Sequence, residues 1–156
     1  MQTSAAGSKH GPALVRGFTL LELLVVVALI AVATAGVGLS MRDSADSALE
    51  RDADRLAALL ETGRAQARAN GMPVVWRAQA QGFVFEGLPP PGLPDRWLSE
   101  TTRAEPGKAI TLGPEPLIEP QALALSSLQL PGKTLWVVTD GLRPFKVQST
   151  PDRVGL

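Results

Sequence analysis

The sequence predicts an α+β fold in which one long N-terminal helix packs against a small antiparallel β-sheet domain. Three observations support this prediction. An apolar run without charge, Leu23–Met41, is followed by a stretch with helical apolar periodicity, Arg42–Ala69. After Gly71 the pattern changes to short strands separated by turn residues. A helix and a sheet that each have one apolar face must bury that face. We therefore expect the two to pack together.

The first half of the predicted helix is long enough to cross a membrane. Phe18–Met41 comprises 24 residues, which is about 36 Å of helix at 1.5 Å per residue, and a bilayer core is about 30 Å thick. The preceding residues 1–17 contain Lys9 and Arg16 and no acid. Since basic residues beside an apolar helix are retained in the cytoplasm, the part after the helix is expected to be exported.

The second half of the helix has one apolar side. Its apolar positions recur at steps of three and four residues: Ala45, Leu49, Ala53, Leu56, Leu59 or Leu60, and Ala67. Two acid-before-base pairs, Asp52 with Arg55 and Glu61 with Arg64, are expected on the exposed side. No proline lies between Phe18 and Ala69, and Asn70-Gly71 gives a C-terminal stop signal. The sequence therefore predicts one continuous helix over Phe18–Ala69.

Two hairpins are expected in the domain that follows. The first joins Val74–Arg77 to Phe83–Glu86 through a turn around Gln81-Gly82, and the second joins Thr134–Thr139 to Phe145–Gln148 around Asp140-Gly141. Weaker strand patterns lie at Ala109–Leu112 and Ala122–Leu130, and the proline-rich Leu88–Trp97 is a loop. Of the three tryptophans, Trp76 and Trp136 are expected in the core, whereas Trp97 is either a loop anchor or a contact with another subunit.

Composition excludes several function classes. Fifteen basic residues balance fifteen acidic ones, and no basic cluster with interleaved aromatics occurs, so no nucleic-acid partner is expected. The chain has no cysteine, and its one histidine, His10, precedes the apolar run. A His-dependent catalytic triad and a zinc site therefore lack their residues. No phosphate-binding loop motif occurs either. The sequence predicts neither an enzyme nor a bound cofactor or metal.

An acidic cluster on the helix is also interpreted as structural. Its members, Asp43, Asp46, Glu50, Asp52 and Asp54, spread around a helix axis, so a solvated face is expected rather than a calcium site.

One acid, Glu22, stands at the head of the apolar run. An acid within a membrane segment costs about 2.5–3.5 kcal/mol on insertion scales, and such residues are usually functional. A carboxylate near a helix N-terminus regains only about 0.3–1 kcal/mol from the helix dipole. We therefore expect Glu22 to have a partner.

The segment Arg16-Gly17-Phe18-Thr19-Leu20-Leu21-Glu22 resembles the type III signal sequence of type IV pilins and type II secretion pseudopilins. The resemblance implies that a prepilin peptidase cuts between Gly17 and Phe18 and then N-methylates Phe18. It also implies that Glu22, as the fifth mature residue, meets the Phe18 amine of a neighbouring subunit. The chain would then divide into a leader (1–17), a membrane and filament-core helix (18–41), an amphipathic helix (42–70) and a periplasmic β domain (71–156).

Two later stretches resemble the minor pseudopilin H family of type II secretion systems: residues 57–87, AALLETGRAQARANGMPVVWRAQAQGFVFEG, and residues 139–147, TDGLRPFKV. This resemblance implies an inner-membrane protein that assembles near the tip of a periplasmic pseudopilus and supports export of folded proteins. The implied partners are the other minor pseudopilins, the major pseudopilin, the prepilin peptidase and methyltransferase, and the inner-membrane assembly platform.

Several alternatives remain open. A minor pilin of the FimT/FimU class would share the signal, although that class often carries a C-terminal cysteine pair, which this chain lacks. An ordinary single-pass anchor would keep Met1. A conventional signal peptide would be cut after Ala33-Thr34-Ala35, before Gly36. A membrane-tethered periplasmic enzyme would need catalytic groups that the sequence does not show. The mature N-terminus, at Phe18, Met1 or Gly36, separates the first three.

Overall fold

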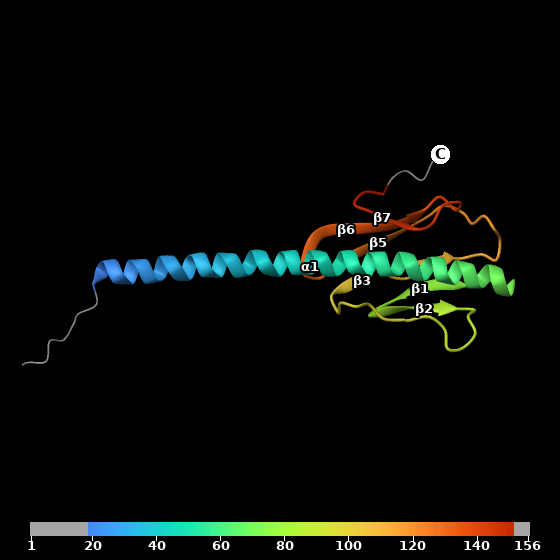
Figure 1. The fold of residues 1–156 in the computed structure, drawn as a ribbon, viewed down its shortest axis with the longest axis horizontal. Helices are drawn as coiled ribbons and strands as arrows, with labels where there is room; N and C mark the ends of the chain where they lie inside the picture. The colour runs from blue at the N-terminus through green and yellow to red at the C-terminus, as the bar shows by residue number, and fades with distance from the viewer. Residues whose placement is uncertain (1–18, 152–156) are drawn as a thin grey trace, which may run out of the picture. The chain divides into compact units, whose positions relative to one another are not determined.

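The structure is a computed structural model that describes residues 19–151. Its one helix, α1, spans Leu20–Asn70 and is 51 residues long (Figure 1). The continuous helix predicted from the sequence is confirmed, with both ends shifted. It begins after Thr19, whose side chain caps the first turn, and it ends one residue later than expected, where Gly71 adopts a positive φ of 64°. Residues up to Gly38 and residues from Leu39 form two compact units.

Seven short strands follow α1 in the second unit, and all of their pairings are antiparallel. They form two sheets rather than the single sheet expected. One has the order β2-β1-β4 and the other the order β3-β5-β6-β7. The strand bounds are β1 Val75–Gln79, β2 Gly82–Glu86, β3 Thr102–Ala104, β4 Ala109–Thr111, β5 Gln121–Ser127, β6 Leu130–Thr139 and β7 Lys146–Gln148. The α+β class is confirmed, and β3 is a strand that the sequence did not predict.

The core of this unit lies between the amphipathic half of α1 and the two sheets, which run alongside it (Figure 1). The helix contributes the apolar positions that its periodicity identified, including Leu49, Leu56 and Leu60, each at most 1% exposed. Both predicted hairpins are present, as β1–β2 and β6–β7. The weaker patterns correspond to β4 and β5. Local apolar patterning therefore located most of the core.

The three tryptophans have different environments. Trp76 on β1 is fully buried, as predicted. The prediction for Trp136 was wrong: it is half-buried and lies outside the core cluster, because its neighbours Leu135 and Val137 occupy the core-facing side of β6. Trp97 is half-buried, with its ring centroid 4.7 Å from that of Phe83. This contact supports the interpretation of Trp97 as a loop anchor.

Candidate functional site

The start of α1 is closed by a side-chain cap. The Thr19 hydroxyl oxygen accepts a hydrogen bond from the Glu22 backbone N–H at 3.1 Å, and the Thr19 carbonyl accepts one from the Leu23 N–H at 3.1 Å. Thr19 is thus the N-cap residue, and Glu22 is the third residue of the helix, which is the spacing of a capping box. The Glu22 side chain is exposed and lies in the first turn, where the helix dipole favours a negative charge.

No cation within residues 19–151 forms an ion pair with the Glu22 carboxylate. The two residues of the expected cleavage site, Gly17 and Phe18, lie outside the described residues. The structure therefore places Glu22 in the first turn of the helix, three residues after its Thr19 cap.

The helix surface from Leu20 to Gly38 is apolar and open. Its exposed large side chains include Leu20, Leu21, Leu24, Leu29, Ile30, Val32 and Val37. The hydroxyl of Thr34 lies within 2.9 Å of the carbonyl oxygens of Ile30 and Ala31, so this polar group bonds within the helix. By length and composition α1 is able to cross a membrane, and the apolar window is not buried in the protein.

Residues 13–38 match the family model described as the prokaryotic N-terminal methylation motif. This motif is a type IV prepilin-like signal, and the long helix packed with small antiparallel sheets is a type IV pilin-like architecture. The match covers the capped helix start and the apolar surface, and it implies processing by a prepilin peptidase and assembly with other pilin-like subunits. Comparison with curated proteins and with solved structures gave no match.

In the folded domain that follows the motif, a buried carboxylate from α1 holds a loop. Asp52 is only 1% exposed, which overturns the prediction that it lies on the exposed side. Its carboxylate oxygens accept hydrogen bonds from the Leu98 N–H at 2.6 Å, the Ser99 N–H at 3.0 Å and the Thr102 hydroxyl at 2.7 Å. Three donors converge on one buried anion, so Asp52 joins the helix to the loop that leads into β3.

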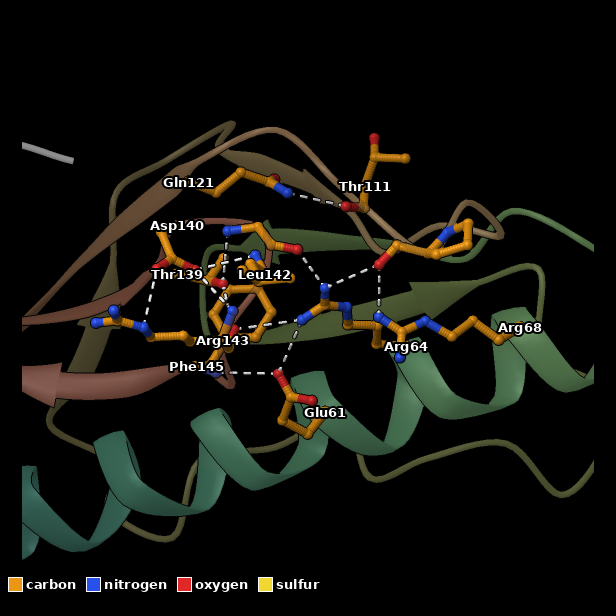
Figure 2. A network of polar contacts seen from close by, with 12 residues as sticks. Glu61, Arg64, Arg68, Thr111, Gln121, Thr139, Asp140, Leu142, Arg143 and Phe145 are labelled. Carbon is orange, nitrogen blue, oxygen red and sulfur yellow. Dashed lines mark hydrogen bonds and ion pairs between the residues drawn. The ribbon is translucent and has the colours of Figure 1, made fainter. Parts of the chain in front are cut away.

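A buried cation, one turn after Glu61, holds two further loops. Arg64 is 2% exposed and was also predicted on the exposed side. Figure 2 shows its guanidinium reaching from α1 toward backbone carbonyls. It donates to the carbonyls of Gly141, Pro116 at 3.3 Å and Arg143 at 3.4 Å.

The expected contact between Arg64 and Glu61 does form, since their closest charged atoms are 3.7 Å apart. Glu61 also accepts a hydrogen bond from the Phe145 N–H at 3.0 Å, so the pair joins α1 to the segment before β7 (Figure 2). The predicted solvent-facing pair is instead part of the attachment between the helix and the loops.

The Asp140-Gly141 turn, predicted as structural, is the turn that Arg64 binds. The Asp140 carboxylate accepts hydrogen bonds from the N–H groups of Arg143 at 2.7 Å and Leu142 at 2.9 Å, and these bonds hold its pKa below the usual value. Gly141 has a φ of 85°, and a Cβ atom there would collide with the carbonyl of Ile118. Only glycine fits this position without strain.

Lys133 and Arg77 each form ion pairs at the surface of the same domain. The side-chain hydrogen bond with Asp46, 3.1 Å away, raises the pKa of Lys133, and Glu50 adds to this effect. A side-chain hydrogen bond with Glu86 likewise raises the pKa of Arg77. Arg77 and Glu86 are exposed and Lys133 and Asp46 are half-buried, so these surface pairs contribute little to stability. Within residues 19–151, no group of three or more potential metal ligands gathers.

Asp52 and Arg64 could have been found from the sequence by their spacing. Asp52 stands three residues after Leu49 and four before Leu56, so it falls on the apolar side of the helix. Arg64 stands four residues after Leu60 and three before Ala67. A charged residue in phase with the apolar positions indicates a buried and hydrogen-bonded charge.

We expect Asp52→Asn to destabilise the domain by about 1–3 kcal/mol, because the amide group that replaces one oxygen is a donor facing other donors. Urea unfolding followed by tryptophan fluorescence measures the change, since Trp97 adjoins Leu98 in the loop that Asp52 holds. The matched control is Asp54→Asn, an exposed acid on the same helix, which should change stability by less than about 0.5 kcal/mol. Equal effects of the two variants would contradict a role for Asp52 in holding the loop.

Proposed function

We propose that this protein is a minor pseudopilin of a type II secretion system, which assembles near the tip of a periplasmic pseudopilus and supports export of folded proteins. The observation that carries this proposal is the capped, acid-bearing helix start within the methylation motif. The amphipathic continuation of α1 against two antiparallel sheets fits a subunit that combines a filament-core helix with a folded head. The likeness of residues 57–87 and 139–147 to the minor pseudopilin H family supports the finer assignment.

The proposed processing produces the partner that Glu22 lacks within the described residues. A prepilin peptidase cuts between Gly17 and Phe18 and N-methylates Phe18, which gives each mature subunit a cationic terminus. In a stack of axially offset helices, Glu22 of one subunit meets the Phe18 amine of the next. Because an unpartnered charge in a dry environment costs several kcal/mol, this pairing sets the register between subunits.

The proposed partners follow from this role. They are the other minor pseudopilins, the major pseudopilin, the prepilin peptidase and the inner-membrane assembly platform. Before assembly the protein is held in the inner membrane by the apolar part of α1, with the domain of residues 71–156 in the periplasm. In this role the chain is a structural subunit and not a catalyst.

Two measurements test the proposal. Intact-mass analysis with N-terminal sequencing of the native protein should give N-methylated Phe18 as the first residue, whereas a start at Met1 or Gly36 overturns the proposed processing. Deletion of the gene should abolish release of exoproteins.

The alternative, a minor pilin of the FimT/FimU class, predicts loss of twitching or DNA uptake with exoprotein release intact. Minor pilins of the FimT/FimU class often carry a cysteine pair near the C-terminus. This chain has no cysteine, which favours the pseudopilin.

A further inference from the structure

Strand β4 is an edge of its sheet, and the register shows which of its backbone groups are available. The Ala78 N–H donates to the Lys108 carbonyl at 2.9 Å, and the Leu112 N–H donates to the Val74 carbonyl at 2.8 Å. Hydrogen-bonded pairs alternate along an antiparallel ladder, so Ile110 also bonds to β1, opposite Trp76. The N–H and C=O groups of Ala109 and Thr111 therefore point away from β1. Among the described strands, none pairs with that side.

This edge lies along a groove of about 530 Å³. The groove is lined by Ala109, Thr111, Glu115, Leu117, Ile118, Glu119 and Gln121. Its charged lining residues, Glu115 and Glu119, are both acidic and exposed. The nearby cation Arg68 does not line the groove and donates to the Pro116 carbonyl at 2.9 Å. The groove therefore combines directional backbone groups with a negative rim.

One backbone acceptor on this edge already receives the kind of bond that an added strand would supply. The Gln121 side-chain amide donates to the Thr111 carbonyl at 2.9 Å (Figure 2). Natural sheets often cover their edges in this way, which prevents unwanted pairing. Gln121 is half-buried and its side chain is long, so it can be displaced by a strand that supplies N–H groups in register.

We propose that the β4 edge and its groove bind an extended, lysine- or arginine-bearing segment of an adjacent pilin-like subunit by β-strand addition. Backbone hydrogen bonds to Ala109 and Thr111 provide the geometry, and Glu115 and Glu119 select a basic segment. The class of the partner rests on the proposed function, whereas the strand addition rests on the geometry of β4. A partner added at a sheet edge extends that sheet from one subunit to the next.

Binding of a model strand tests the geometry. The probe is a fluorescein-labelled peptide of alternating lysine and valine, and the full chain is held in nanodiscs of phosphatidylcholine. The expected result is binding of this peptide in preference to its glutamate–valine counterpart. A lysine–valine peptide N-methylated on the backbone nitrogens that face the edge should not bind. Equal binding of all three peptides overturns the proposal.

Three variants identify the binding edge. Thr111→Pro removes the outward N–H while the β1–β4 bonds, which use Lys108, Ile110 and Leu112, remain; proline is tolerated at such edge positions. Peptide binding should fall about tenfold, as expected for the loss of one hydrogen bond and of some shape complementarity at the edge. The control Thr111→Ala keeps the N–H and should bind as the parent does. Gln121→Ala removes the competing amide and should strengthen binding. If Thr111→Pro misfolds, the test rests on Gln121→Ala. This variant should bind the lysine–valine peptide more tightly than the parent, and unchanged binding overturns the proposal.

A photo-crosslinking amino acid at position 109 tests the partner in cells. The expected product is an adduct with another pilin-like subunit, identified by mass spectrometry. The same group at position 128, in the exposed turn between β5 and β6, should not give this product. An adduct with an exported protein, or none at position 109, overturns the assignment of the partner. Processing at Phe18 and exoprotein release are separate readouts, so the proposed function can stand or fall independently.

Discussion

Glu22→Ala is expected to leave the protein inserted and processed but to reduce its incorporation into filaments by tenfold or more. The substitution removes the anion that is proposed to neutralise the Phe18 ammonium of a neighbouring subunit, and one tenfold step corresponds to about 1.4 kcal/mol. An unpartnered charge among apolar helices costs several kcal/mol, which exceeds that step. Membrane fractionation and N-terminal sequencing check insertion and cleavage, and the amount of the subunit in sheared filaments measures assembly.

The matched control for this prediction is Asp43→Ala. Asp43 is an exposed acid on the same helix, but it lies after the apolar run and is not expected to meet the Phe18 amine. Glu22→Gln separates charge from shape, because it keeps the size of the side chain and loses the anion; it should assemble as poorly as Glu22→Ala. Undiminished incorporation of both Glu22 variants would refute the proposed pairing.

The parts predicted from the sequence are those determined by local pattern. The helix follows from apolar spacing over Arg42–Ala69 and from the stop at Asn70-Gly71, and the hairpins follow from turn residues between alternating strands. Strand β3 was not predicted because it has only three residues and no apolar alternation. It is recognised as a strand only by its antiparallel pairing with β5. The division into two sheets was also missed, because strand order depends on contacts between distant segments.

In the candidate site, too, the features set by adjacent residues could be predicted, whereas those set by distant contacts could not. The methylation motif is linear, so its features, Thr19 as a cap and Glu22 three residues later, can be read from adjacent residues. The buried charges are not linear, because the donors to Asp52 come from a loop at Leu98–Thr102. Pairing each acid with the nearest base along the helix therefore gave the wrong environment for Asp52. The phase of a charge relative to the apolar positions was the better guide.

Arg64→Met is expected to destabilise the domain by about 3–5 kcal/mol, since the carbonyls of Gly141, Pro116 and Arg143 each lose a donor in a largely buried setting. Methionine refills part of the volume of the arginine but donates no hydrogen bond. Because all three tryptophans lie after α1, urea unfolding followed by their fluorescence reports on this domain. Hydrogen exchange should quicken in residues 113–119 and 140–145, the two loops that Arg64 joins.

The matched control is Arg68→Met, one helical turn further on. Arg68 also donates to the Pro116 carbonyl, at 2.9 Å, but it is exposed, so its loss should cost less than about 1 kcal/mol. Arg64→Lys keeps a positive charge without the planar fork that reaches several carbonyls at once, and it should fall between the two methionine variants. If Arg64→Met were no more destabilising than Arg68→Met, apolar packing would be what holds the loops of residues 113–119 and 140–145 against α1. The buried guanidinium would then be tolerated by the fold without stabilising it.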